Sequence, residues 1–126
     1  MGRHRIASSQ APGPAGAASA GISAGRFVFV SAQLPQDGRG ELVGGSAADQ
    51  AGRALDNLAH QLRSTGLTLD DVVSLEIHLV EPADDPAVDT AIEARFSPPF
   101  PSRSVLGVAW LPGGARLQIA AIAQRY

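Results

Sequence analysis

The chain has 126 residues, of which 44% are hydrophobic and 17% charged, and its formal net charge is -2. This length and composition favour one globular domain over residues 1–126, and the charge pattern lacks the basic stripe expected of a nucleic-acid-binding protein. The absence of cysteine excludes disulfides, thiolate metal sites and a cysteine nucleophile.

The N-terminal part of the chain is predicted to be irregular. Residues 9–25 are rich in alanine, glycine, serine and proline, which favours a loop, and residues 1–21 are expected to be partly flexible. This part lacks the apolar core of a secretory signal, and the chain has no stretch of about 18 apolar residues that could span a membrane. We therefore expect a cytoplasmic protein without a membrane partner.

A strand, a turn and a helix are predicted next. Residues Arg26–Leu34 are dense in phenylalanine and valine and are followed by a proline, which indicates a buried strand. The glycine-rich residues 36–45 indicate a turn. Residues Ser46–Thr65 predict a helix, because apolar residues recur every three or four positions. Ser46 suits the N-cap of that helix, and Gly66 suits its end.

The second half of the chain predicts a strand, a helix and a final pair of strands. Residues 71–82 alternate in polarity, which indicates a strand with one face on the core. The core-facing residues are expected to be Val73, Leu75, Ile77 and Leu79. Residues 85–95 predict a shorter helix, and residues 103–123 predict two buried strands joined in a hairpin at a Pro-Gly-Gly turn. Strands that alternate with helices indicate βαβ units.

Arg103 is the one early charge in the apolar stretch 100–123, and it directly follows a proline-rich loop. A guanidinium in apolar surroundings is costly to bury unless it meets an anion, and its planar fork suits a carboxylate. The alternative is a strand-end arginine whose stem packs and whose head reaches water. Spacing alone favours this alternative.

Glu76 and His78 form a second candidate site. They lie two residues apart on the polar face of a predicted strand, where His78 can act as an acid or base if that face lines a pocket. More often such a pair is only the polar face of a half-exposed strand. His4 and His60 are expected to be solvated. No histidine or carboxylate spacing is typical of a metal site, so no metal is expected.

Three stretches of the sequence resemble one known family. "RFVFVSAQLPQDGRGELVGGSAADQAGRALDNLAHQL" resembles a strand followed by Ser-Gly-Gln-(Ile/Leu)-Pro, a Gly-Glu-Leu-Val turn and a helix carrying Asn-Leu. "STGLTLDDVVSLEIHLVEP" resembles a Gly-Leu, Asp-Asp-Val-Val step into the next strand. "FPSRSVLGVAWLPGGARLQIAAIA" resembles a closing signature of Pro-Ala-Arg-Ser, Val-x-x-Leu-Pro and Glu-Ala-Ile-Ala. The motifs agree in order over residues 22–124, and together they resemble the reactive intermediate deaminase family (Rid or YjgF-type).

The resemblance implies a fold and an activity. It implies a chorismate-mutase-like α+β fold, with a mixed β-sheet packed against two helices, and a homotrimer with sites in the clefts between subunits. Family enzymes hydrolyse enamines and imines, such as 2-aminoacrylate, to a 2-oxo acid and ammonia. The family arginine that binds the substrate carboxylate matches Arg103. No cofactor is implied, and the expected partners are a small carboxylate-bearing molecule and further copies of the chain.

Three departures from the family pattern are visible in the sequence. The Gly-Pro-Tyr stretch of active deaminases is replaced by Gly13-Pro14-Ala15, which lacks the tyrosine. The Ser-Gly-Gln motif becomes Ser31-Ala32-Gln33, and the Glu-Ala-Ile-Ala motif begins at Ala120 instead of glutamate. The resemblance implies that this glutamate positions or activates water. Its absence puts the usual acid–base chemistry in doubt.

Three functions were weighed from the sequence. The first is an enzyme that hydrolyses carboxylate-bearing imines or enamines, or catalyses related dehydration or cyclisation. In it Arg103 anchors the carboxylate, Glu76 and His78 substitute for the missing acid–base group, and the pocket is lined by Ser31, Ala32, Val105 and Ala120. The second is a non-catalytic trimer that binds small carboxylates or regulates another enzyme. The third, a ribonuclease or RNA-binding role, is least favoured because the chain has no basic cluster.

Overall fold

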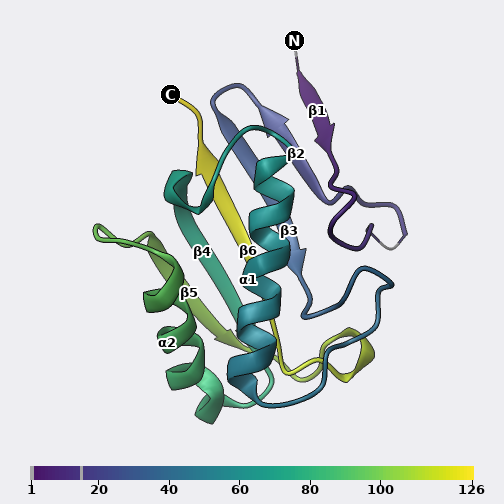
Figure 1. Ribbon diagram of the computed structural model, residues 1–126, viewed down its shortest axis with the longest axis vertical. Coiled ribbons are helices and arrows are strands. Elements are labelled where there is room, and N and C mark those ends of the chain that lie inside the picture. Colours follow the sequence, from purple (N-terminus) through teal and green to yellow (C-terminus); the bar gives the residue numbers. More distant parts are fainter. Residues whose placement is uncertain (1, 15) are drawn as a thin grey trace.

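The computed structural model describes residues 2–14 and 16–126 of the chain. Two helices cover one face of a six-stranded mixed sheet with the strand order β1-β2-β3-β6-β4-β5 (Figure 1). The strands are β1 (Arg3–Ile6), β2 (Gly21–Ala24), β3 (Phe27–Gln33), β4 (Val72–Leu79), β5 (Ser102–Gly107) and β6 (Leu117–Gln124). The helices are α1 (Ala47–Arg63) and α2 (Asp85–Arg95). This arrangement confirms the expected α+β fold with a mixed sheet against two helices.

The boundaries of α1 follow from local chemistry. Ser46 lies at the N-cap, where its hydroxyl accepts from the Asp49 N–H while the Asp49 carboxylate accepts from the Ser46 N–H. This reciprocal pair satisfies two of the amide groups that a helix start leaves without a partner. Past the other end, Gly66 adopts a φ of +81°, the left-handed conformation that favours glycine after a helix. The helix predicted over Ser46–Thr65 is confirmed.

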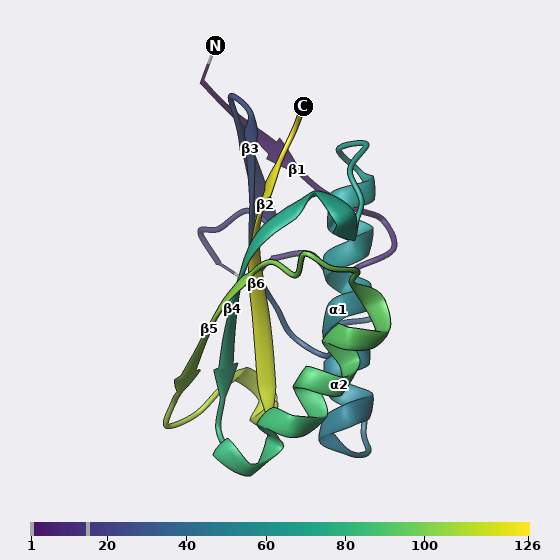
Figure 2. The same cartoon turned by 90° about the vertical axis from the view of Figure 1, so that its left-hand side faces the viewer.

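The hydrophobic core lies between the helices and the sheet. Its fully buried residues include Leu55, Leu58, Leu62, Ile77, Val88, Leu117 and Ile119. Figure 2 shows both helices on the same side of the sheet, so the other face carries no helix. Neither helix of the described residues combines the length and the apolarity needed to cross a membrane.

The central strand of the sheet differs from the sequence prediction. β4 and β5 run parallel and are joined through α2, which confirms a βαβ unit. The predicted hairpin between β5 and β6 is wrong, because β6 pairs antiparallel with both β3 and β4 and leaves β4 between the last two strands. Every second residue of β6 is buried, which shows that one face of this central strand lies against the core.

An irregularity in β4 changes which residues face the core. The register with β6 shifts between Val72 and Ser74, so Val72 is buried and Val73 is 38% exposed. The expectation that Val73 faces the core is therefore wrong. An extra residue in one strand reverses the alternation on one side of the irregularity, which sequence alternation alone does not reveal. Leu75, Ile77 and Leu79 face the core as predicted.

The N-terminal segment contains more regular structure than predicted. Residues 3–6 and 21–24 form β1 and β2, which extend the sheet beyond β3 as an antiparallel meander. At Gly21 a Cβ atom would lie 2.8 Å from the Phe29 carbonyl oxygen and 2.5 Å from the end of the Ile6 side chain. The close approach of the two backbones explains the glycine. Ala15, where the resemblance implies a tyrosine, lies outside the described residues.

Candidate functional site

β5 carries Arg103 along an exposed edge of the sheet. All six residues of β5 are exposed, because the strand pairs with β4 on one side only. The expectation that Arg103 begins a buried strand is therefore wrong. Its side chain nevertheless lies on the helix-covered face, since Arg103 is beside the buried Leu75. Val105, beside the buried Ile77, shares that face.

Arg103 is held by two aspartates of α2. Its Nη1 donates to the Asp89 carboxylate at 2.7 Å, and its Nη2 lies 3.8 Å from the Asp85 carboxylate. The guanidinium thus meets anions supplied by its own chain. The sequence interpretation missed both partners, although residues four apart on a helix share a face. The Arg103 and Asp89 side chains are 27% and 51% exposed, so the ion pair adds at most about 1 kcal/mol to stability.

A cavity of about 280 Å³ opens beside this ion pair. Leu75 and Ile92 form apolar walls, and the loop before β5 adds Phe100 and Pro101. Three charged side chains line the same cavity, namely Arg103, Asp89 and Glu93. A small cavity with apolar walls and a few convergent polar groups is typical of a site for a small molecule.

Glu76, His78 and Gln118 form a second polar cluster on the opposite face of the sheet. His78 Nε2 lies 2.9 Å from the Glu76 carboxylate, and His78 Nδ1 lies 2.7 Å from Gln118 Nε2. An ionised carboxylate only accepts, so Nε2 carries the proton, and in a neutral ring Nδ1 accepts from the glutamine amide. Both ring nitrogens are therefore engaged. Sequence reasoning missed Gln118, because its place beside His78 depends on the pairing of β4 with β6.

A shallow cavity of about 240 Å³ lies beside this second cluster. Its lining includes Glu76 and Ser74 from β4, Phe29 from β3 and Ala120 from β6. Ala120 lies directly opposite Glu76 in the sheet. The structure thus brings Glu76, His78 and Ala120 together on the face without helices. Within one chain the sheet separates them from Arg103.

Ser31 and Ala32 lie near the end of β3, where the register with β6 is irregular. The Ser31 hydroxyl donates to the Ser19 carbonyl at 2.7 Å, which ties the N-terminal segment to the strand. Beyond the strand, the fully buried Asn57 of α1 donates to the carbonyls of Leu34 and Gln36 at 3.0 and 2.8 Å. These bonds fix the backbone on both sides of Ala32, which is half-buried.

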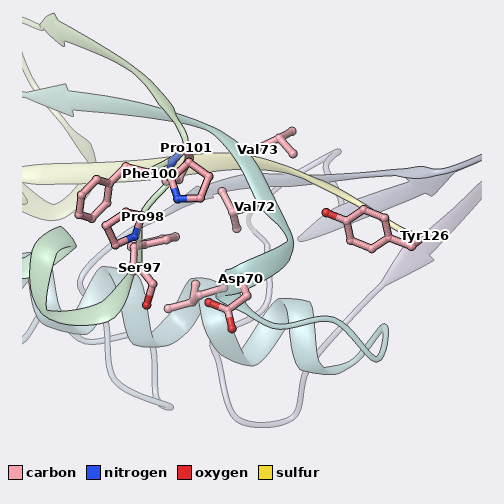
Figure 3. A pocket seen from close by; sticks show the side chains of 11 residues that line it. Asp70, Val72, Val73, Ser97, Pro98, Phe100, Pro101 and Tyr126 are labelled. Atoms are coloured by element: carbon pink, nitrogen blue, oxygen red, sulfur yellow. The ribbon is translucent and has the colours of Figure 1, made fainter.

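A larger cavity, about 530 Å³, lies at the start of β4 and shares Phe100 and Pro101 with the cavity beside Arg103 (Figure 3). It is bounded by the proline-rich loop that follows α2, by the start of β4 and by Tyr126. Asp70 is the only charged side chain in its lining, and no basic or histidine side chain joins it there. It therefore offers no anchor for an anion, unlike the cavity beside Arg103.

Two titratable groups outside these clusters have shifted pKa values. Burial lowers the pKa of His60, and the positive charge of Arg63 lowers it further. The ring is half-buried, so the expectation of a solvated His60 is wrong. Backbone N–H groups of Arg39 and Glu41 lower the pKa of the exposed Asp37 carboxyl. The described residues contain no group of three or more histidine, cysteine or acidic side chains that could hold a metal ion.

The fold defines a class of small α+β proteins, in which two helices cover one face of a mixed sheet. The comparisons with known proteins place the chain within that class. The family model described as Endoribonuclease L-PSP matches residues 8–125. The chain belongs to this family, that of the Rid/YjgF proteins, and the resemblance stated from the sequence is confirmed.

Curated relatives cover nearly the whole chain. The 2-iminobutanoate/2-iminopropanoate deaminase of Dermatophagoides farinae is 35% identical over 118 residues, which are 93% of this chain and 92% of that protein. The human protein of the same name is 33% identical and covers 96% of this chain and 89% of its own. These relatives support a deaminase-type role at the level of the family.

Solved structures agree with the fold. RidA from the Antarctic bacterium Psychrobacter is 30% identical, with a TM-score of 0.92 over 96% of this chain and 98% of its own. TdcF of E. coli, solved with bound serine, is 28% identical, with a TM-score of 0.89 over 98% of this chain and 99% of its own.

Proposed function

We propose that this protein hydrolyses small imines or enamines that carry a carboxylate, releasing a 2-oxo acid and ammonia. The observation that carries the proposal is Arg103, which lines a small apolar-walled cavity and which the resemblance matches to the arginine that binds the substrate carboxylate. The names of the curated relatives support the reaction type. The serine bound to TdcF is itself a small carboxylate-bearing molecule, which supports the ligand class.

The proposed reaction needs little from the protein. A protonated imine is already electrophilic, so water adds to its carbon and the resulting carbinolamine loses ammonia to leave the 2-oxo acid. Arg103 would anchor the carboxylate through a charge-assisted hydrogen bond, and Val105 would line the pocket on the same face. Dehydration and cyclisation also proceed by addition and elimination at such a carbon, so the proposal includes them.

A homotrimer with sites between subunits is part of the proposal. Large apolar side chains, Phe29 and Leu106 among them, are nearly half exposed on the face without helices, and the outer edge of β5 is unpaired in the described chain. Contact between copies would cover both features. It would also offer a way to bring Glu76 and His78 of one copy towards Arg103 of another. A monomeric mass in light scattering at micromolar concentration would contradict this arrangement.

The alternative is a trimer that binds small carboxylates without catalysis, as a sensor or as the partner of an enzyme. One observation favours it: Ala120 stands where the resemblance implies a glutamate, and the nearest substitute in that strand pair, Glu76, is hydrogen-bonded to His78. A cytoplasmic location, which the sequence favours, is proposed for either function.

An activity assay separates the two functions. A 2-imino acid would be generated in place by oxidation of an amino acid, and formation of the 2-oxo acid would be followed against the uncatalysed rate. We expect the parent protein to accelerate hydrolysis and Arg103→Ala to lose at least about 30-fold in kcat/KM. That loss corresponds to the low end of the roughly 2–5 kcal/mol typical of truncating one partner of a charge-assisted pair. If Arg103→Ala accelerated hydrolysis as much as the parent does, Arg103 would not be the residue that anchors the substrate carboxylate.

A further inference from the structure

The cavity beside Arg103 has an unusual charge balance for a site that binds an anion. Arg103 is the only positive side chain in its lining, whereas Asp89 and Glu93 both contribute a carboxylate. Asp85, whose carboxylate lies 3.8 Å from Arg103, adds a third negative group beside the arginine. The arginine is therefore already neutralised by Asp89 at 2.7 Å before any ligand enters.

We propose that this cavity selects zwitterions: small acids whose carboxylate binds Arg103 and whose positively charged nitrogen binds the carboxylates of Asp89 and Glu93. This inference rests on the proposed function, because it takes Arg103 as the anchor of the carboxylate. It extends that function by assigning a substrate charge class, a protonated 2-imino acid or a 2-amino acid, and two residues that recognise the nitrogen.

Electrostatics gives the first reason for this selection. A plain 2-oxo acid would bring a third anion next to Asp89 and Glu93, and like charges held close together repel each other. A zwitterion brings no net charge and supplies the cation that these carboxylates lack. The guanidinium has five N–H donors, and Asp89 accepts from one of them at Nη1, so donors remain for a ligand carboxylate.

The helix supplies the second reason. Asp85, Asp89 and Glu93 recur every four residues, which places them along one face of α2. Asp89 and Glu93 line the cavity from that face, while Arg103 lines it from β5. Both charge signs therefore line one cavity of about 280 Å³, within reach of a molecule whose opposite charges lie on adjacent carbons.

The selection has a consequence for turnover. In the proposed reaction, a protonated imine with a carboxylate reacts with one water to give a 2-oxo acid and ammonium, so atoms and charge balance. The substrate has no net charge, whereas the organic product is an anion that the carboxylates of α2 repel. The same groups that hold the substrate nitrogen would therefore favour release of the product.

The test compares two stable probes that share a carbon skeleton. L-Alanine is a zwitterion, and pyruvate is the 2-oxo acid that has a keto oxygen in place of its ammonium group. Calorimetry would give their dissociation constants for the parent and for Asp89→Asn, which removes the negative charge but keeps an oxygen that can accept from Arg103. We expect the parent to prefer alanine and Asp89→Asn to shift the ratio of the two constants by about tenfold towards pyruvate.

Two further variants make the outcome specific. Glu93→Gln should shift the ratio in the same direction, and Glu41→Gln, which removes an exposed carboxylate from the loop before α1, should leave it unchanged. An unchanged ratio in both Asp89→Asn and Glu93→Gln would overturn the zwitterion selection. Arg103→Ala tests the carboxylate anchor separately, because this change should weaken the binding of both probes. If Arg103→Ala bound both probes as well as the parent, the proposed function itself would fail.

Discussion

Asn57 offers a direct test of how the fold fixes the backbone near the candidate site. The side chain is fully buried in α1, and its Nδ2 donates at 3.0 and 2.8 Å to the carbonyls of Leu34 and Gln36. Asn57→Ala would remove one of two donors from each carbonyl, because Leu34 O still accepts from the Gln36 N–H and Gln36 O still accepts from Arg53 Nε. A buried hydrogen bond contributes about 0.5–1.5 kcal/mol net, so loss of the pair should lower the free energy of unfolding by roughly 1–3 kcal/mol.

The assay is denaturation by urea at fixed protein concentration, since assembly would couple stability to concentration. A loss of this size should lower the melting temperature by roughly 10 °C in a domain of this length. Gln36→Ala is the matched control, because it removes a side chain and keeps the carbonyl that Asn57 contacts. Asn57→Asp should be at least as destabilising as Asn57→Ala, because a carboxylate would face two carbonyl oxygens. A loss below about 0.5 kcal/mol in Asn57→Ala would refute the reasoning.

Two predictions concern the cluster on the face without helices. Ala120→Glu would place a carboxylate directly opposite Glu76, so we expect a loss of roughly 0.2–1 kcal/mol in stability and a partial gain in imine hydrolysis that grows when Glu76→Gln is added. No gain in either background, measured with the imine assay, would argue that the site serves another reaction. His78→Ala should lower kcat by about 10²–10⁴-fold and change the pH–rate profile if His78 acts as the substitute base. An unaltered profile would remove His78 from the mechanism.

The sequence predicted those features that depend on neighbours along the chain. The capping pair of Ser46 and Asp49 and the glycine after the helix act within a few residues, so the limits of α1 could be predicted. The polarity of residues 71–82 likewise predicted β4, because alternation is also local. The irregularity at Val73 could not be predicted, since it becomes visible only when β6 lies alongside.

The candidate site was predicted in residue type but not in arrangement. Spacing alone favoured a strand-end arginine at Arg103, and the resemblance implied an anion-binding one. Neither revealed Asp89, which comes from α2 and meets Arg103 only through the crossover between β4 and β5. Glu76 and His78 were identified as a pair, and the structure confirms that they contact each other. Strand register decides that Glu76 and His78 lie on the opposite face of the sheet from Arg103. Register is decided by pairing between distant segments, which a single sequence does not encode locally.

The central position of β6 has a consequence for how this chain is made. During synthesis β3 and β4 are complete before β6 exists, and the edge that each of them later offers to β6 has no native partner in the interval. Before β6 is made, the native pairing of the other strands falls into two separate sets, one of β1 to β3 and one of β4 and β5. The last strand joins them only when residues 117–124 emerge. Loss of this short segment from the C-terminal end would divide the sheet in two and leave both halves open to aggregation.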